Sequence, residues 1–409
     1  MAGALLTSLV IIPNLLFQAG MDFMAAYTAL CIASVAGTAW LAYCRLPYLA
    51  FPSVAVTGWL VYLVIISRGF SWQQVLGLSA IVSLLGLGLF LSKWGQRLLA
   101  GMPPVLSWAM KPAVGLLLIL LGLTQGRIIV ASPWSVTMLG DFQDPLAYLG
   151  TTGLVIGMAL LVLKTRDVLA WSFLLTALLA LAEGFWVLPE APVILPEGMD
   201  KVIGQLSCSG SAVDAKPVEY IGTGLALLLV VNSQSVAMLN ALGQKEKAHG
   251  LMAGLAGISF LGTFLGSLPL SVSPLSAIAK TSSAGRIKAV LTCVSALAVL
   301  MFFEPVAAAL AKFPVMAVPV LVLSGLFLCR EAWEEVPRLS GSAAQWEEFL
   351  PAACVLVIMP LSWNIAAGLG AGLICWTVAM LLAGRGREVA WSSRVLSLCF
   401  LMYFLLGDI

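Results

Sequence analysis

The segment Leu265–Arg286, LGSLPLSVSPLSAIAKTSSAGR, lies in an apolar part of the chain and is long enough to span a membrane, yet it holds two prolines, six serines and one lysine. Pro269 and Pro274 each remove a backbone hydrogen-bond donor, and SLPLSVSP alternates apolar and polar residues. We therefore predict that 267–273 is extended and that 274–285 is a half-helix with Pro274 in its first turn. The break then falls near the midplane of the membrane.

The chain around this segment has the composition of a polytopic helical membrane protein. Its 409 residues are 61% hydrophobic and only 10% charged, and apolar runs of about 18–22 residues recur along it. The first run lacks a basic n-region and a cleavage site, so we interpret it as the first span rather than a signal peptide. A net charge of +2 gives no argument for a nucleic-acid partner.

We predict an all-α protein with about 14 transmembrane segments. The spans are expected near residues 4–19, 22–43, 47–67, 71–92, 107–124, 146–163, 168–186, 219–243, 248–265, 267–285, 287–303, 312–329, 348–361 and 363–383. A further apolar stretch, 392–407, follows, and the sequence leaves open whether it lies along or across the membrane.

The distribution of charge predicts the orientation. With the N-terminus in the cytoplasm, most of the 21 Lys and Arg residues fall in cytoplasmic connectors, as the positive-inside rule requires of an inner-membrane protein. Acidic residues fall in connectors or at span ends, and Asp22, Glu219 and Glu304 are expected at external ends. No carboxylate is therefore expected at mid-membrane.

A second interrupted span precedes the first in the chain. Pro47 to Ser67, PYLAFPSVAVTGWLVYLVIIS, has prolines in an extended start, and we expect its helical part to follow Ala55. The predicted topology runs the third and tenth spans in opposite directions, so both half-helices begin at the midplane and point at each other. A pair of interrupted spans in inverted halves is typical of a transporter binding site, and helix N-termini favour electron-rich ligand groups. The alternative is that the prolines only kink two helices.

Polar residues at mid-depth are the candidates for substrate binding. The eighth span carries VVNSQSVAML, with Asn232, Gln234 and Ser235 about halfway along it. Amides offer both a donor and an acceptor, which suits the edge of a heterocycle. They could equally hydrogen-bond between packed helices.

Hydroxyls and one lysine flank the two breaks. Ser53, Thr57, Ser273 and Ser276 would meet a ligand there, although serines in apolar helices also bond their own backbone. Lys280 either completes an anion or coupling site or extends to the cytoplasmic surface.

No sequence signature of catalysis or metal binding accompanies these residues. The eight cysteines show no CxxC spacing and the chain has one histidine. We find no P-loop and no nucleophile elbow, so we expect neither an enzyme nor a cofactor nor a metal site.

Several stretches resemble one transporter family. GLTQGRIIVASPWSVTMLGDFQDPLAYLG (122–150), AGMDFMAAYTALCIASVAGT (19–38), GFSWQQVLGLSAIVSLL (69–85) and EEFLPAACVLVIMPLSWNIAAGLGAGLICW (347–376) are similar, in order, to the adenine/guanine/hypoxanthine permease branch of the nucleobase:cation symporter-2 superfamily. The resemblance implies a 7+7 inverted repeat and proton-coupled uptake of a nucleobase. It also implies a homodimer through the gate domain as one arrangement.

The resemblance further implies a division into domains. Residues 1–93 and 218–303 would form the two halves of a core domain, and 94–186 and 304–409 the two halves of a gate domain with the C-terminal helix. The loop 187–217 would lie outside.

The chain departs from the family at the expected substrate site. The family's F-D-T motif in the eighth span reads VNS here, with Asn232 in place of the Asp, and the Glu of the tenth span is replaced by Leu275 or Ser276. The third span places Thr57 where the family has Asn. Both acids that would grip a purine edge and help couple protons are missing.

Three functions therefore stay open from sequence. The leading one is a secondary transporter of a nucleobase or similar small planar solute, coupled to H⁺ or Na⁺. The second is transport of a small oxyanion or carboxylate on the same fold. The third is a degenerate permease that no longer transports.

Overall fold

The structure is a computed structural model of the chain. It describes residues 2–44, 46, 48–92, 103–134, 137–165, 167–196, 198–207, 217–241, 248–272, 283–339 and 346–406. Seven helices in this part are long and apolar enough to cross a membrane, and shorter apolar helices accompany them. The chain is a multi-pass helical membrane protein, as the composition indicated.

The first half of the chain follows the predicted spans closely. Its helices are α1 (Ala2–Gln18), α2 (Phe23–Tyr43), α3 (Val54–Trp59), α4 (Trp72–Leu91), α6 (Pro104–Gln125), α7 (Pro145–Val162) and α8 (Val168–Ala182). The second half contains α9 (Pro217–Ala241), α10 (Ala248–Phe264), α12 (Ser283–Leu300), α13 (Glu304–Ala311), α14 (Val318–Leu339), α15 (Trp346–Leu361), α16 (Ile365–Leu382) and α17 (Trp391–Leu406).

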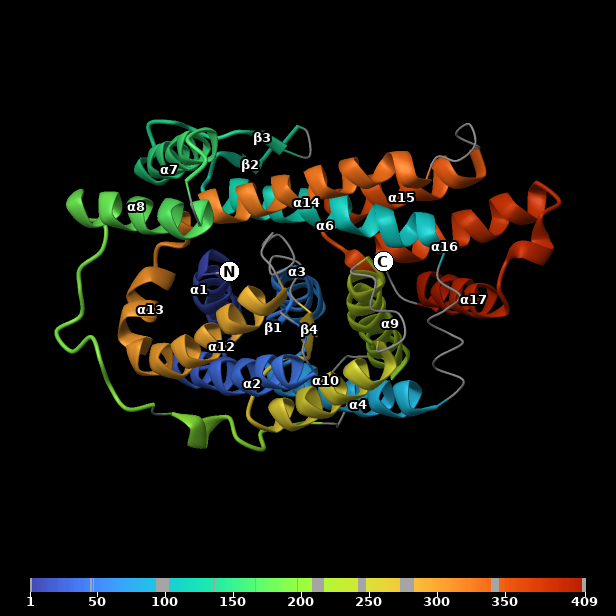
Figure 1. Ribbon diagram of the computed structural model, residues 1–409, viewed down its shortest axis with the longest axis horizontal. Coiled ribbons are helices and arrows are strands. Elements are labelled where there is room, and N and C mark those ends of the chain that lie inside the picture. Colours follow the sequence, from blue (N-terminus) through green and yellow to red (C-terminus); the bar gives the residue numbers. More distant parts are fainter. Residues whose placement is uncertain are drawn as a thin grey trace.

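The helices pack in two layers. In Figure 1, α6, α7, α8, α14, α15 and α16 form the upper layer, where α14 and α15 both pack against α6. The lower layer contains α2, α4, α10 and α12, in which α10 packs against α4 and α12 against α2. The helices α1 and α3 lie between the layers, and α1 contacts members of both.

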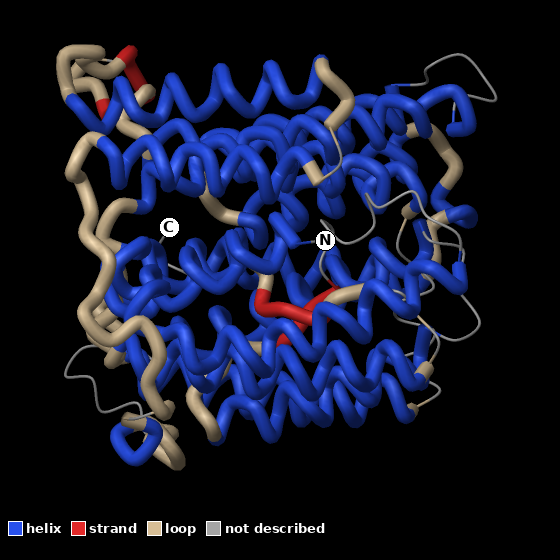
Figure 2. Tube along the Cα trace, turned by 60° about the vertical axis from the view of Figure 1, so that its left-hand side comes forward, coloured by secondary structure: helices blue, strands red, loops and turns tan. Residues whose placement is uncertain are grey.

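Two pairs of three-residue strands interrupt the helices. β1 (Ala50–Pro52) pairs antiparallel with β4 (Leu270–Val272), and Figure 2 shows this pair surrounded by helices near the middle of the molecule. β2 (Ile129–Ala131) pairs with β3 (Thr137–Leu139) in the connection between α6 and α7. The extended starts predicted for the third and tenth spans are thus present, and they pair with each other.

The third span differs from its prediction in two details. Its helix begins at Val54 rather than after Ala55, and from Leu60 to Ser67 it is a π-helix, η1. Among the described residues the tenth span shows only its extended part, so the half-helix predicted for 274–285 lies largely outside them.

The twelfth span is longer than predicted and is preceded by breaks. The expected range was 312–329, but the chain forms η3 (Met301–Phe303), α13, η4 (Pro314–Ala317) and then α14 to Leu339. Pro314 and Pro319 cannot donate backbone hydrogen bonds, which separates α13 from α14. The helix continues past 329 through residues that the sequence placed in a connector, including an Arg330 to Glu334 pair one turn apart.

The C-terminal apolar stretch forms α17, which packs against α16 and α9. The hydroxyls of Thr377 and Ser397 are 2.6 Å apart, and Ser397 also donates to the carbonyl of Leu373. A hydrogen-bonded face buried against two helices shows that this segment is part of the folded bundle.

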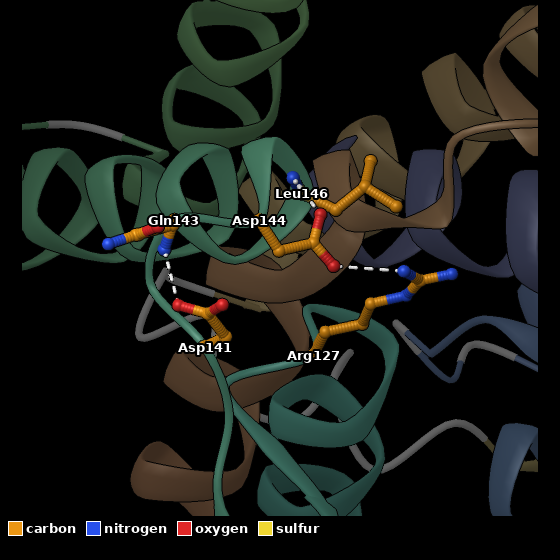
Figure 3. A network of polar contacts seen from close by, with 5 residues as sticks. All are labelled: Arg127, Asp141, Gln143, Asp144 and Leu146. Atoms are coloured by element: carbon orange, nitrogen blue, oxygen red, sulfur yellow. Dashed lines mark hydrogen bonds and ion pairs between the residues drawn. The ribbon is translucent and has the colours of Figure 1, made fainter.

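Polar side chains cap the helices at the ends of the spans. Asp22 accepts from the N–H of Met24, and Ser71 with Gln74 forms a capping box at the start of α4. At the start of α7, Asp144 accepts from the N–H of Leu146 and pairs with Arg127 at 2.9 Å (Figure 3). These caps satisfy backbone donors that the first turn of a helix cannot pair internally.

The part of 187–217 that the structure describes is tied to the bundle. Lys201 in η2 (Met199–Lys201) pairs with Asp22 at 2.7 Å, and the carboxylate of Asp22 raises the pKa of that lysine. The buried side chain of Val202 lies against Gly266.

Candidate functional site

The paired strands β1 and β4 are held by hydroxyl groups from two other helices. Thr38 on α2 accepts a hydrogen bond from the N–H of Ala50 at 3.1 Å. Ser259 on α10 accepts from the N–H of Leu270 at 2.9 Å. These four residues are buried, so each hydroxyl satisfies a backbone donor that has no access to water.

The two hydroxyl contacts occupy corresponding places in the two halves of the chain. Thr38 precedes Ala50 by 12 residues and Ser259 precedes Leu270 by 11. In each half a long helix runs to one surface, reverses, and is followed by an extended segment that returns to the same helix. Neither hydroxyl could be recognised from the sequence, because threonine and serine are common in apolar helices. Each contact forms only when the strand folds back against the helix that precedes it.

Close packing positions the strands as well. A Cβ on Gly37 would lie 2.9 Å from the Cβ of Ala50 and 2.7 Å from the side chain of Leu270, so only glycine lets α2 approach both strands. The hydroxyl of Ser271 donates to the carbonyl of Phe51 across the pair. The strands are therefore fixed on α2, α10 and each other.

The N-terminus of α3 follows directly from β1. Ser53 is the N-cap residue and half-buried, and its side chain makes no capping hydrogen bond in the described structure. The first N–H groups of a helix have no partner within it. Those of α3 therefore require an acceptor from elsewhere, which a substrate could supply.

Thr57, one turn further on, is fully buried at 0% exposure, and its hydroxyl donates to the carbonyl of Ser53 at 3.0 Å. This is the backbone-bonded arrangement that the sequence had left as the alternative to ligand contact.

Asn232 is half-buried and faces α4. A Cβ on Gly86 would lie 3.4 Å from its Nδ2 and 3.5 Å from its Oδ1, so the absence of a side chain at Gly86 leaves room for the amide. Of the other predicted site residues, the side chains of Gln234 and Ser235 lie outside the described ones, as do Ser273, Ser276 and Lys280. The structure thus places Ser53 and Thr57 together at the break, and Asn232 on α9, a helix that contacts β4, with its amide against Gly86 of α4.

Two buried charged residues were not singled out as site candidates. Glu304, expected at an external end, is the first residue of α13 and only 1% exposed. Lys111 of α6 is also buried and lies 3.8 Å from Glu331 of α14. Within the described residues no three His, Cys, Asp or Glu side chains gather as a metal site would require.

Comparison with known proteins gives full-length matches to permeases, while no family model matches the chain. It is 26% identical over 408 residues to a putative permease of Methanocaldococcus jannaschii, covering 96% of this chain and 90% of that protein. It is 25% identical to the guanine/hypoxanthine permease PbuO of Bacillus subtilis, with coverage of 93% and 89%. It is likewise 25% identical to the adenine permease AdeQ of Escherichia coli, with coverage of 97% and 89%.

Solved structures share the fold. The transmembrane domain of a cyanobacterial bicarbonate transporter, BicA, superposes with a TM-score of 0.62 at 13% identity, covering 89% of this chain and 95% of that domain. The murine anion transporter Slc26a9 in its inward-facing state gives a TM-score of 0.55 at 9% identity, covering 94% of this chain and 68% of that protein. The fold is that of a membrane transporter.

The chain is a distant, full-length homologue of the adenine, guanine and hypoxanthine permeases. This confirms the resemblance found in the sequence. The homologues are permeases and not enzymes.

Proposed function

We propose that this protein is a secondary transporter of a nucleobase or a similar small planar solute. The observation that carries the proposal is the pairing of β1 with β4, which brings the two interrupted spans together and places the N-terminus of α3 beside them. Full-length homology to purine permeases supplies the substrate class.

The proposed substrate site lies at the strand pair, between the N-terminus of α3, which follows β1, and α9, which contacts β4. Ring nitrogens and carbonyl oxygens of a nucleobase would accept from these N–H groups. Asn232 would read the edge of the base with its amide, and Gln234, Ser235, Ser273 and Ser276 are the further candidates from the sequence. Thr57 would act by holding the carbonyl of Ser53 rather than by touching the solute.

Transport would follow from relative motion of two domains. In this proposal the upper layer of Figure 1 belongs to the gate (94–186 and 304–409), and the lower layer with α1 and α3 belongs to the core (1–93 and 218–303). The first and second halves of the chain would be related by a 7+7 inverted repeat. The corresponding hydroxyl contacts of Thr38 and Ser259 support the repeat. The N-terminus would be cytoplasmic in an inner membrane, with a homodimer through the gate as one assembly.

Coupling to H⁺ or Na⁺ would have to use residues other than the two acids that the family carries. Lys280 stays a candidate for a coupling or anion contact. Glu304 adds a buried carboxylate at the start of α13, and a buried carboxylic acid that changes protonation is a common coupling device in transporters.

The test is thermal stabilisation of the purified protein by a panel of purines, pyrimidines and small anions, followed by radiolabelled uptake of the best ligand. A purine or pyrimidine should raise Tm, and Asn232→Ala should remove that shift. Gly88→Ala is a matched control, because a Cβ at Gly88 meets nothing within 4 Å and the variant should keep the shift. A panel with no nucleobase response would refute the proposal.

A second function is favoured by one specific observation. The two solved structures described above are a bicarbonate transporter and an anion transporter. The N-terminus of α3 and the lysine Lys280 of the tenth span, without a family acid, would together suit an oxyanion or carboxylate. Stabilisation by anions alone, lost in Lys280→Met, would select this function.

A further inference from the structure

The third span changes helix type after the proposed site. Its π-helix η1 covers eight residues, Leu60–Ser67, which is long for a conformation found mostly as single turns at functional sites. Tyr62 lies in this π-helix and is half-buried. Its hydroxyl donates to Oε1 of Gln18 at 3.2 Å. Tyr62 thus contacts the last residue of α1.

The ring of Tyr62 also meets the turn between α15 and α16. Trp363 packs edge-on against it, with ring centroids 6.2 Å apart and planes at 88°. This is a favourable geometry for an aromatic pair. Tyr62 belongs to the proposed core (1–93) and Trp363 to the proposed gate (304–409), so the contact joins parts that the proposed transport cycle would move past each other.

The backbone of Trp363 is held in an unusual conformation. Its φ is +52°, in the left-handed region that a bulky side chain rarely adopts. The neighbouring Asn364 caps α16 by accepting from the N–H of Ala367 at 3.0 Å. A strained residue persists where its surroundings fix it, and such residues cluster at clamps and switches.

All of these contacts lie at one surface of the membrane bundle. The helices α1, η1, α6 and α15 all end there, at Gln18, Ser67, Gln125 and Leu361. In the proposed orientation this is the external side. The cluster therefore stands between external solution and the paired strands.

We propose that Tyr62 and Trp363 form an external latch that closes the substrate site when core and gate are together, and that Gln18 holds the hydroxyl of Tyr62 on the core side. The inference rests on the proposed function and adds the residues that control access. Opening toward the outside separates the two rings, while Tyr62 and Gln18 move together with the core. Trp363 then acts as a gating residue and not as a substrate contact.

The experiment measures access to the site without any substrate. Ser53→Cys is introduced alone and with latch variants, and its labelling by a membrane-impermeant maleimide is followed in intact cells and in inside-out vesicles. The chain with native Ser53 gives the background from the natural cysteines. Because no nucleobase is used, failure of the nucleobase assay leaves this test readable.

Trp363→Ala should raise the external labelling rate about two- to tenfold, the shift in population that one aromatic contact supplies. Trp363→Phe keeps an aromatic edge and should label like the parent. Tyr62→Phe keeps the ring but loses the hydrogen bond to Gln18 that orients it, and its labelling rate should fall between those two. Trp363→Gly removes the ring and places at this position a residue that adopts a positive φ without strain. Its external labelling rate should match that of Trp363→Ala, which separates loss of the latch from a folding defect.

The latch is rejected if external labelling is equal with and without Trp363. It is also rejected if Ser53→Cys reacts from neither side in every variant, or if Trp363→Ala and Trp363→Gly only lower Tm. A rise seen only in inside-out vesicles would place the latch on the cytoplasmic side and overturn the external assignment.

Discussion

The two strand pairs have the same secondary structure and opposite environments. β1 and β4 are buried at every position, whereas β2 and β3 are half-buried or exposed. The first pair joins segments more than half the chain apart, and the second closes a local hairpin between α6 and α7. In an apolar interior each backbone donor needs a partner, which is why helices supply hydroxyls to β1 and β4.

The exposed pair, β2 and β3, is held by contacts at the base of its own hairpin rather than by hydroxyls from other helices. The N–H of Gly140 donates to the carbonyl of Ile128, and the Arg127 to Asp144 pair lies at the base of the hairpin. At its far end Trp134 is 95% exposed, and Met138 and Leu139 are 47% and 67% exposed. A strand pair at the surface can use water for its free groups, so it depends less on any single contact.

The largest expected effect comes from filling the space behind the buried pair. Gly37→Leu would force the side chain into Ala50 and Leu270, and we expect a loss of about 3 kcal/mol or more in the free energy of unfolding. Gly88→Leu is the matched control on α4, where nothing lies within 4 Å of the added Cβ. Thermal melts in detergent measure both. Equal Tm values would show that α2 does not hold the strands.

Removing one of the two hydroxyls should lower the free energy of unfolding by less than Gly37→Leu does. Thr38→Val and Ser259→Ala each leave a buried backbone N–H without its acceptor, and we expect a loss of about 1–2 kcal/mol from either change. Thr124→Val is the control, because its hydroxyl bonds only carbonyls of its own helix among described contacts and should change stability by less than about 0.5 kcal/mol. Denaturant titration measures the differences. A large loss from Thr38→Val but none from Ser259→Ala would break the correspondence of the two halves.

The contribution of the Arg127–Asp144 ion pair at the base of the exposed hairpin to the free energy of unfolding should depend on pH. Hydrogen bonds from the N–H of Leu146 and from Arg127 lower the pKa of Asp144. A lowered carboxyl pKa in the folded protein gives stability that is complete above the ordinary value and is lost as the pH falls through the folded value. Asp144→Asn should therefore differ from the parent above about pH 4 and converge with it in stronger acid. A constant difference at all pH values would assign the effect to the cap alone.

The smallest effect is expected at the tip of the exposed pair. Trp134→Ser removes a side chain that is 95% exposed, and we expect the free energy of unfolding in detergent to change by less than about 0.5 kcal/mol. A change as large as that of Thr38→Val would mean that the hairpin is buried in the working assembly. Cross-linking of the detergent-purified protein would then test for a second copy.

Much of this architecture follows from the chain itself. The apolar runs predict the boundaries of most helices. The two interrupted spans are predicted by paired prolines, Pro47 with Pro52 and Pro269 with Pro274. Proline removes a donor whatever surrounds it. The distant homology to the purine permeases is visible in sequence because the similar stretches run through the whole chain in order.

The sequence could not give the partners of these segments. Thr38, Ser259 and Gly37 look like ordinary residues of apolar helices, and their roles arise only because β1 and β4 pair against α2 and α10. The burial of Glu304 depends on how α13 turns away from α12. The π-helix at Tyr62 and the left-handed Trp363 are likewise set by the contact between distant spans.

The chain by itself thus determined that it is a multi-pass helical membrane protein with interrupted spans, since hydrophobicity and proline placement act locally along the sequence. The tertiary structure decided which donors meet which acceptors and which rings meet at the surface. Hydrogen bonds and ring contacts need specific distances between residues that lie far apart in the chain, and only the folded arrangement sets those distances.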